Sequence, residues 1–197
     1  NTIDTISGTN TLQVGDGNVA TINLGKSGDT INVPTGATLT VPSGGLSGQN
    51  YPAFEAYLSA NQSISDNAVT KVQFDTKLFD TDSTYDNSTN YRFTPGVAGK
   101  YFIYSSILNE AGSNSNLIEA YMYIKKNGAN VLELETSLNN NPGRLMPTFG
   151  MATLDLNDTD YVEIYGRLNS VSGSGQLFEG NTTYKRATKF GAYRIGT

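Results

Sequence analysis

The sequence predicts an all-β fold built from short antiparallel strands. Many short runs alternate apolar and polar residues at a period of two, as expected for strands that pack one face. Asn, Asp, Gly and Ser bound these runs, and those residue types favour turns. Strands and turns that follow one another in this rhythm typically form an antiparallel sandwich or barrel.

The central element of this fold is expected between Tyr91 and Tyr104. Its first half ends in the pair Pro95–Gly96, which favours a tight turn. Its second half alternates aromatic and aliphatic side chains at the period of a pleated strand. We therefore predict a strand, a turn and a central strand. Further strands are expected in the run that holds Val72, Phe74 and Leu78, and in residues 120–124, 131–134, 161–165 and 190–195.

Composition divides the chain into two parts. All 12 Tyr and 8 Phe lie at or after Tyr51, so the first fifty residues hold no aromatic core material. That part holds nine of the 21 Gly and only four charged side chains. We predict a β stem over residues 1–45, a linker over 46–51 and a globular head over 52–197.

The predicted stem contains four short repeats, which begin at Thr11, Thr21, Thr30 and Thr38. The second and fourth residues of each are apolar, so each predicts a minimal strand, and Gly-rich turns separate them. One chain with so few apolar side chains would not offset the entropy of ordering this segment, at about 1–2 kcal/mol per residue. We therefore expect a stem that is ordered only in an oligomer. A flexible linker is the alternative.

Charge and missing residue types exclude several function classes. The net charge is −5 and the 13 Lys and Arg are scattered, which argues against a nucleic-acid surface. The absence of Cys and His removes the usual structural zinc sites, the cysteine proteases and the serine–histidine triads. No apolar run approaches the ~20 residues that span a bilayer, so no membrane insertion is expected.

The spacing of aromatic and turn residues resembles a known signature. Five, four, seven, five, one and one residues separate the successive members Phe74, Asp80, Tyr85, Phe93, Gly99, Tyr101 and Ile103. This pattern resembles the globular head of the complement first component and its relatives, the tumour-necrosis-factor-like jelly rolls. Further landmarks of that family are matched in order by residues 52–56, 72–75, 124–128, 154–162 and 190–193.

The resemblance covers about residues 52–196 and departs from the family pattern at three places. One residue too many separates Tyr85 from Phe93, Ile103 stands where Phe is expected, and Thr159–Asp160 replaces Gly-Asp. The resemblance implies a ten-stranded jelly roll that forms a tight homotrimer, with aromatic residues along the threefold axis. It also implies a non-enzymatic head that recognises partners through outer loops, with calcium near the axis in some members.

The residues themselves also indicate an oligomer. An aromatic-rich sandwich with several flat strands would expose an apolar face as a monomer, and such faces generally mark interfaces. The candidate interface residues are Tyr101, Tyr121, Tyr123, Phe149 and Tyr193. For each of them, ordinary core packing is the competing assignment.

The sequence offers carboxylates for two kinds of chemical site, a calcium site and a site for glycan cleavage. Asp80, Asp82 and Asp86 offer hard oxygen ligands to calcium, but a solvated turn is the favoured interpretation. A carboxylate-based glycan depolymerase would need two carboxylates that face each other at about 5–9 Å. Glu133 and Glu135 share a strand face by parity, as Asp158 and Asp160 would if that segment were extended. Alternating charges on a strand are usually its solvated side, so no catalytic residue and no cofactor are expected.

The composition of residues 30–44 resembles that of bacteriophage fibre and decoration proteins. This resemblance implies a homotrimeric virion protein, assembled in the host cytoplasm, where a chain without Cys is well suited. It would be a tail-fibre tip or a capsid decoration, with a stem that contacts other virion proteins. The expected recognition loops, which would bind a host surface glycan or protein, contain Asn109, Ser113, Asn114, Asn116, Asn140, Asn141, Arg144, Ser172 and Gln176. A secreted glycan- or protein-binding module is the alternative, and a depolymerase is third.

Overall fold

The computed structural model describes residues 30–38, 51–138, 140–181 and 185–196. The chain divides into two units, Asn1–Leu46 and Ser47–Thr197, and each is considered by itself. In the first unit, residues 30–38 are exposed and form no strand, so the strand expected at Thr30–Pro34 is absent from the single chain. The turn expected after it is present, because the Ala37 N–H donates to the Pro34 carbonyl at 3.0 Å. The rest of the predicted stem, and the linker up to Asn50, lie outside the described residues.

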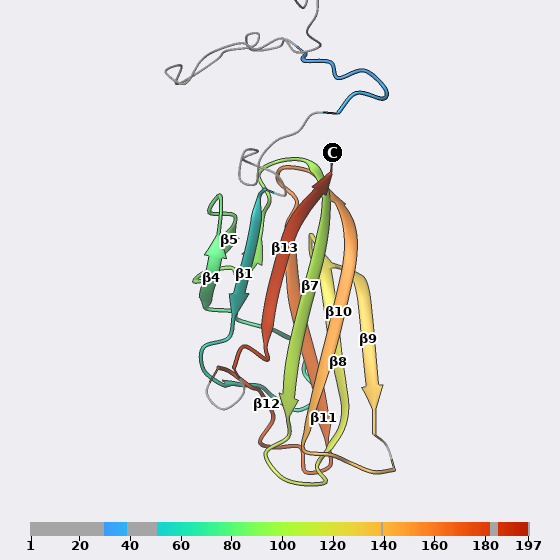
Figure 1. Cartoon of the computed structure of the whole chain (residues 1–197). Coiled ribbons are helices and arrows are strands. Elements are labelled where there is room, and N and C mark those ends of the chain that lie inside the picture. Colours follow the sequence, from blue (N-terminus) through green and yellow to red (C-terminus); the bar gives the residue numbers. More distant parts are fainter. Residues whose placement is uncertain (1–29, 39–50, 139, 182–184, 197) are drawn as a thin grey trace, which may run out of the picture. The chain divides into compact units, whose positions relative to one another are not determined.

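The second unit, which we call the head, is a sandwich of two antiparallel sheets (Figure 1). Sheet A has seven strands, and its β7 has β10 on one side and β13 and β12 on the other. Its strands are β1 (Ala53–Tyr57), β2 (Gln62–Ser63), β4 (Thr76–Asp80), β7 (Gly99–Glu110), β10 (Leu145–Leu156), β12 (Leu177–Phe178) and β13 (Lys189–Gly196). Sheet B has six strands, in the order β5-β6-β11-β8-β9, with β3 also paired to β11. Its strands are β3 (Thr70–Lys71), β5 (Tyr85–Asp86), β6 (Arg92–Phe93), β8 (Leu117–Lys126), β9 (Ala129–Ser137) and β11 (Val162–Ser170).

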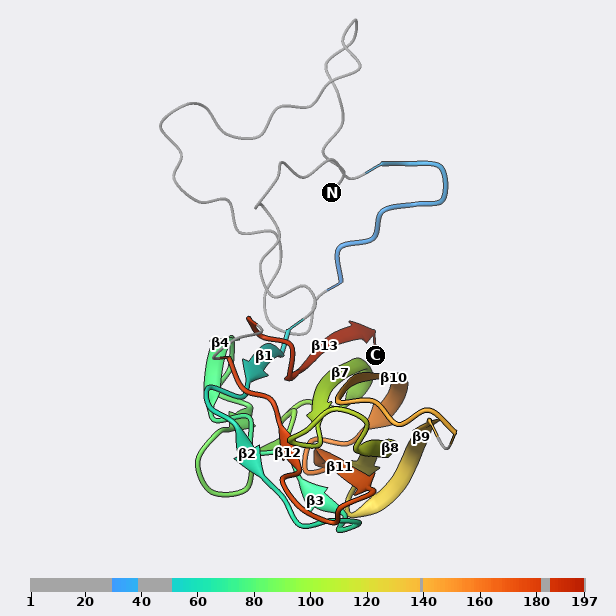
Figure 2. The same ribbon diagram turned by 90° about the horizontal axis from the view of Figure 1, so that it is seen from below.

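The two sheets enclose one hydrophobic core, and Figure 2 shows the two layers end-on. Phe54 of β1 lies at its aromatic centre, stacked on Tyr85 at 4.6 Å and on Phe93 at 4.9 Å between ring centroids. Phe190 of β13 meets the Phe54 ring edge-on at 4.9 Å. Burial of each such ring stabilises the fold by roughly 1.5–3 kcal/mol. Tyr85 and Phe93, two aromatic residues of the predicted signature, therefore join sheet B to Phe54 of sheet A.

The predicted strand, turn and central strand between Tyr91 and Tyr104 are confirmed. Gly96 takes a φ of +69° at the turn, and its N–H donates to the Asp158 carbonyl at 3.0 Å. The strand before the turn, β6, belongs to sheet B, whereas β7 belongs to sheet A, so the chain crosses between the layers here. The run from Val72 to Leu78 differs from expectation. Val72 and Phe74 are buried but lie outside any strand, and Leu78 is exposed on β4, which begins only at Thr76.

The remaining predicted strands are confirmed within longer elements. Residues 120–124 and 131–134 form the hairpin of β8 and β9, whose turn has Asn127 and Gly128 at φ of +51° and +82°. Such a pair of positive φ values is typical of a two-residue hairpin turn. Residues 162–165 fall in β11, which begins one residue later than expected, and residues 190–195 fall in β13. Among the described residues, no helix is long and apolar enough to cross a membrane.

The sandwich has two distinct ends. At one end, which we call the junction end, β1 begins and β13 finishes, and the Arg194 N–H donates to the Pro52 carbonyl at 3.3 Å. At the other, which we call the loop end, β7 passes into the segment 111–116 (Figure 1). The described part of the head begins with Tyr51 and Pro52, which precede β1, so the chain enters the head at the junction end.

Candidate association and recognition surfaces

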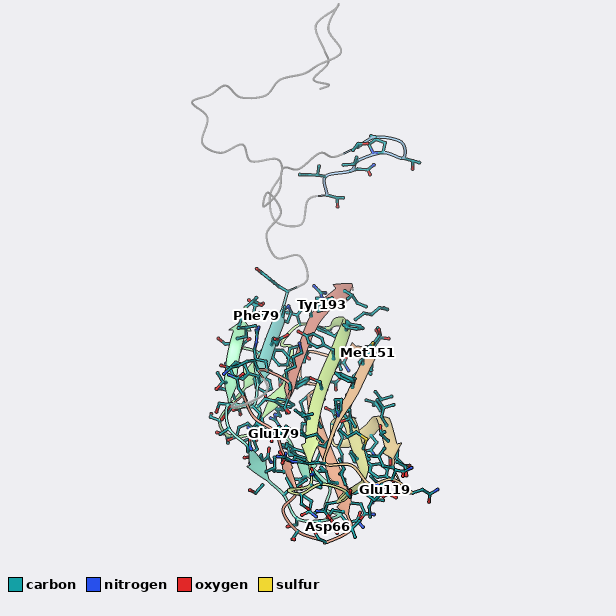
Figure 3. The ribbon with its side chains drawn as sticks, turned by 60° about the horizontal axis from the view of Figure 1, so that its bottom comes forward. Asp66, Phe79, Glu119, Met151, Glu179 and Tyr193 are labelled. Carbon is teal, nitrogen blue, oxygen red and sulfur yellow. The ribbon has the colours of Figure 1, made fainter. Side chains whose placement is uncertain are left out.

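The outer face of sheet A carries an exposed apolar surface. Phe149 and Met151 of β10 are 64% and 62% exposed, although each has a large apolar side chain. Met151 lies opposite Tyr104 of β7, and Tyr193 of β13 lies opposite Phe102. The Phe102 ring is 5.4 Å from the Tyr193 ring and 6.2 Å from the Tyr104 ring, between centroids. We call these five residues the apolar face, and Figure 3 shows Met151 and Tyr193 on the same side of the head.

A glycine shapes the centre of the apolar face. The Tyr104 ring lies over Gly191 of β13, where a Cβ would stand 2.3 Å from the ring. The Tyr104 hydroxyl donates to the Glu55 carboxylate at 2.8 Å. Burial, together with Glu55, raises the pKa of the Tyr104 phenol well above its usual range. The ring therefore lies flat across β7, β13 and β1 and contributes to a smooth surface.

The outer face of sheet B has tyrosines too, but charged side chains lie between them. The Arg167 guanidinium of β11 lies 3.8 Å from the centre of the Tyr121 ring, and Lys125 lies 4.4 Å from that of Tyr165. The Lys71 ammonium of β3 pairs with Glu163 at 2.5 Å. Such cation–π and ion pairs keep aromatic rings compatible with water. We call this surface the charged face.

Three loops from different parts of the chain meet at the loop end. The Asn116 N–H donates to the Gly143 carbonyl at 2.8 Å, which joins the segment 111–116 to the segment 138–144. The Asn116 amide oxygen accepts the Ser172 N–H at 2.9 Å, which joins both to the segment 171–176. Gly112 and Gly175 lie against each other, both at positive φ, and a Cβ on Gly112 would stand 3.0 Å from the Gly175 carbonyl oxygen.

A carboxylate fixes a fourth segment to the same end. Asp66, which Figure 3 labels there, accepts the Ser170 N–H at 3.0 Å and the Gln176 side-chain N–H at 2.7 Å. Gln176 also donates to the Ser170 hydroxyl. A buried polar network in which every member is bonded holds loops in one conformation. The loop end is thus a preformed surface rather than a set of independent loops.

Comparison with known protein families now identifies this arrangement. The family model of the C1q domain matches residues 53–182, about two thirds of the chain. The chain belongs to the C1q domain family. Its head resembles the globular domain of the zebrafish complement 1qA protein, with a TM-score of 0.50 and 20% identity over 73% of this chain and 97% of that one. It also resembles the TNF protein Eiger from S. frugiperda, with a TM-score of 0.49 and 13% identity over 73% and 92% of the two chains. A search of curated proteins found no match.

The five predicted interface residues lie in three different places in the C1q head. Phe149 and Tyr193 lie on the apolar face, whereas Tyr121 and Tyr123 lie on the charged face of the opposite sheet. For Tyr101 the structure shows the competing assignment, core packing, because the ring is fully buried and its hydroxyl donates to the Val97 carbonyl at 2.7 Å. Tyr123 is likewise only 6% exposed.

Sequence reasoning missed three members of the apolar face: Phe102, Tyr104 and Met151. In the run from Tyr101 to Tyr104, consecutive residues are all aromatic or aliphatic, so the pattern does not indicate which set points inward. For Met151 the signal was parity along the strand, because it lies two residues after Phe149 and therefore shares its face.

The predicted recognition residues divide by burial. Ser113, Asn114, Asn140, Asn141, Arg144 and Ser172 are exposed at the loop end. Asn109, Asn116 and Gln176 are at most 4% exposed, which corrects the expectation that their side chains face a ligand. The Asn109 amide instead donates to the Met146 carbonyl at 2.9 Å, so these three residues support the loops from beneath. A shallow pocket of about 360 Å³ lies beside the exposed set, lined by Ser137, Leu138, Asn140 and Asn141.

Two carboxyl groups share a site on the sheet A side, near the loop end. Glu110 accepts two N–H bonds from Arg144, at 2.6 and 2.9 Å, and is hydrogen-bonded to Glu179. The bond from Glu179, with that from Arg144, lowers the pKa of Glu110. Burial and the Glu110 charge raise the pKa of Glu179 to about 7. The pair therefore holds one proton near neutral pH, because two adjacent carboxylates repel each other.

The three aspartates considered for calcium serve other roles. Asp80 accepts the Thr84 N–H at 2.9 Å and pairs with Lys77 at 2.8 Å. Asp86 accepts N–H groups from its own turn, among them Thr89 at 2.9 Å, and these bonds lower the pKa of Asp86. Asp82 is exposed. In the described part of the chain, no group of three or more Asp or Glu is placed to hold a metal ion, so these residues do not form one ligand set.

The paired carboxylates considered for glycan cleavage do not form a shared site either. Glu133 and Glu135 are exposed on β9, beside the tyrosines of the charged face. Asp158 is exposed, whereas Asp160 is buried at the β8–β9 turn, where it accepts from the Asn127 amide at 2.7 Å. Hydrogen bonds from Asn127, Asn157 and Lys126 lower the pKa of Asp160 to about 2, so it would not act as an acid at neutral pH.

Proposed function

We propose that this protein is a homotrimeric, non-enzymatic fibre protein of a virion, with a C1q head that recognises a partner through its loop end. The apolar face of sheet A carries the proposal. A contiguous surface of Phe102, Tyr104, Phe149, Met151 and Tyr193 would be costly to leave in water, and such surfaces mark interfaces. C1q domains typically form homotrimers, which also supports self-association.

The positions of the two ends of the head agree with a fibre role. The chain enters the head at the junction end through Tyr51 and Pro52, and the preformed loops lie at the opposite end of β7. Threefold symmetry about sheet A would place three sets of loops together, so that weak contacts become strong through multivalency. The exposed Asn and Ser side chains there suit a host surface glycan or protein.

The N-terminal repeats and the composition favour the virion setting over a secreted one. The repeats that begin at Thr11, Thr21, Thr30 and Thr38 would bury their apolar residues if three chains wound together, and so would join the head to other virion proteins. A chain without Cys suits assembly in a reducing cytoplasm. A tail-fibre tip and a capsid decoration are the two positions on a particle that this arrangement fits.

Light scattering after size exclusion tests the trimer. The full chain at micromolar concentration is expected to elute with three times its mass of 21.1 kDa. A monomer of that mass would remove the basis of the proposal. Immunogold labelling of particles with antibody to the head then tests the location. Label on tail tips or on capsids supports the fibre role, and label on no particle would favour a secreted binding module instead.

A further inference from the structure

A second candidate binding site lies at the junction end, away from the recognition loops. A pocket of about 470 Å³ opens there between the two sheets. The backbone of Ala98–Gly99 forms one wall, and Leu156 of β10, which is 3% exposed, forms part of the lining. Its polar side chains are Lys126, Asp155, Asn157 and Arg194. This volume is in the range of small-molecule sites.

Arg194 of β13, in sheet A, lines the pocket, and not all of its N–H groups have a partner. Its Nη2 donates to the Ala98 carbonyl at 3.0 Å, but its buried Nε has no partner. No carboxylate of the described residues forms a salt bridge with it. The guanidinium lies against Gly99, where a Cβ would be 2.7 Å from Nε, so the missing side chain of this glycine makes room for it. An arginine whose charge has no carboxylate partner favours an anion, which would accept from the guanidinium N–H groups that face the pocket, because the buried Nε is out of reach.

Lys126 enters from sheet B and faces the same space. Its ammonium donates to the Asp155 carbonyl at 2.7 Å and pairs with Asp160 at 2.9 Å. Asp155, whose side chain is 80% exposed, lies at the rim, 3.4 Å from Lys100. Arg194, Lys126 and Lys100 are three cations, and Asp155 and Asp160 are two carboxylates. The net charge of these five side chains is therefore one positive charge, and Arg194 supplies it.

We propose that this pocket binds a carboxylated sugar of the uronic-acid class, with the carboxylate on Arg194 and the hydroxyl groups on Asp155 and Asn157. The single excess charge matches a monoanion, whereas the nearby carboxylates of Asp155 and Asp160 would repel a phosphate dianion. The planar guanidinium matches a carboxylate, which it can bind through two parallel N–H bonds. The apolar wall of Leu156 and Gly99 would contact the sugar ring. This proposal does not depend on the trimer or on the loop end.

Calorimetry on the full chain tests the assignment with D-glucuronate, D-glucose, acetate and inorganic phosphate as probes. Glucuronate is expected to bind at millimolar concentration, more tightly than acetate, and glucose is expected not to bind. Arg194→Gln should weaken glucuronate binding by about tenfold or more, because a charge-assisted pair of hydrogen bonds is lost. Arg167→Gln, which removes a cation from the charged face, is the matched control and should bind like the parent chain.

A variant with the opposite expected sign guards against a folding artefact. Asp155→Asn removes a negative charge from the exposed rim and keeps hydrogen-bonding groups, so it should tighten acetate binding. Damage to the fold would weaken it instead. The proposal is overturned if glucuronate does not bind, if Arg194→Gln leaves its affinity unchanged, or if phosphate binds more tightly. Equal affinity for acetate and glucuronate would overturn the sugar assignment, since the carboxylate alone would then be recognised.

Discussion

The two outer faces of the head are built from the same kind of strand but differ in how they meet solvent. On the charged face, Tyr121 is covered by Arg167, and Tyr165 by Lys125 and Lys71. On the apolar face, Phe149 and Met151 have no charged neighbour opposite them on β7, where Ser106 and Tyr104 stand. A face with charges between its aromatic rings is solvated as it stands. A face with few charges between its large apolar side chains is the surface through which the proposed trimer would associate.

The largest expected effect comes from charging the apolar face. The double variant Phe149→Glu/Met151→Glu should convert the trimer to a monomer, because six carboxylates would have to be buried between three chains. Light scattering after size exclusion measures the change in mass. Val131→Glu is the matched control, since Val131 is a 42% exposed apolar residue on β9 of sheet B.

One outcome would contradict the assignment of the association surface to sheet A. If the double variant remained a trimer while Val131→Glu dissociated, the association surface would lie on sheet B. The charged face would then be the interface, despite its internal ion pairs. A parent chain that is monomeric would remove the distinction altogether.

A smaller effect is expected from Gly191→Ala, which alters the shape of the apolar face without changing its charge. The new Cβ would stand 2.3 Å from the Tyr104 ring, so the ring must lift from the sheet and release Glu55. Overpacking of this kind costs about 1–3 kcal/mol. Thermal unfolding should shift downward and trimer dissociation should occur at higher protein concentration. Gly196→Ala on the same strand is the control, because a Cβ there meets nothing within 4 Å. Equal behaviour of the two variants would contradict the role of the flat ring.

Much of the fold was predictable because its determinants are local. The turn at Pro95–Gly96, the hairpin at Asn127–Gly128 and the alternation within β8 and β11 each depend on a few adjacent residues. The signature residues Phe74, Tyr85 and Phe93 are all core residues, which explains why their spacing identified the family.

The candidate surfaces were less predictable because they depend on pairing between distant strands. Nothing near Tyr101 indicates that it points inward while Phe102 points outward, and the direction is set by partners on β10 and β13. The burial of Asn109 and Gln176 depends in the same way on segments 37 and 110 residues away. Polar residues in a loop are easily taken for ligand contacts when they are the bonds that hold the loop.

The Glu110–Glu179 pair should make the stability of the head depend on pH. On the charged face Glu163 and Glu119 each have a cation, at 2.5 and 3.8 Å, whereas Glu179 has Glu110 as its hydrogen-bonded neighbour, a hydrogen bond from Asn61 and the more distant charge of Arg144. The pKa of Glu179 rises from an ordinary 4.5 to about 7, so the folded chain binds more protons than the unfolded chain between these values. The free energy of unfolding should therefore be highest below pH 4.5 for this group and should fall as the pH rises through 7.

Glu179→Gln tests this dependence, because the amide cannot ionise and still donates to Glu110. Urea unfolding at a series of pH values should show a decline from pH 5 to 8 in the parent chain and a flatter profile in the variant. The absence of His leaves few other side chains to titrate in this window. Identical profiles for the two chains would show that the pair is not strained near neutral pH.

The smallest expected effect concerns the charged face itself. Arg167→Met keeps the apolar stem over Tyr121 but removes the charge that lies 3.8 Å from the ring centre. The free energy of unfolding should fall by about 0.5–1 kcal/mol, with the mass of the trimer unchanged. A double-mutant cycle with Tyr121→Leu isolates the pair, and a coupling energy of this size is expected between them at one fixed protein concentration. A coupling near zero would mean that water, rather than the cation, satisfies the ring. The charged face would then owe its solubility to its carboxylates alone, and the presence of interleaved cations would no longer distinguish a solvated sheet face from one that requires a partner.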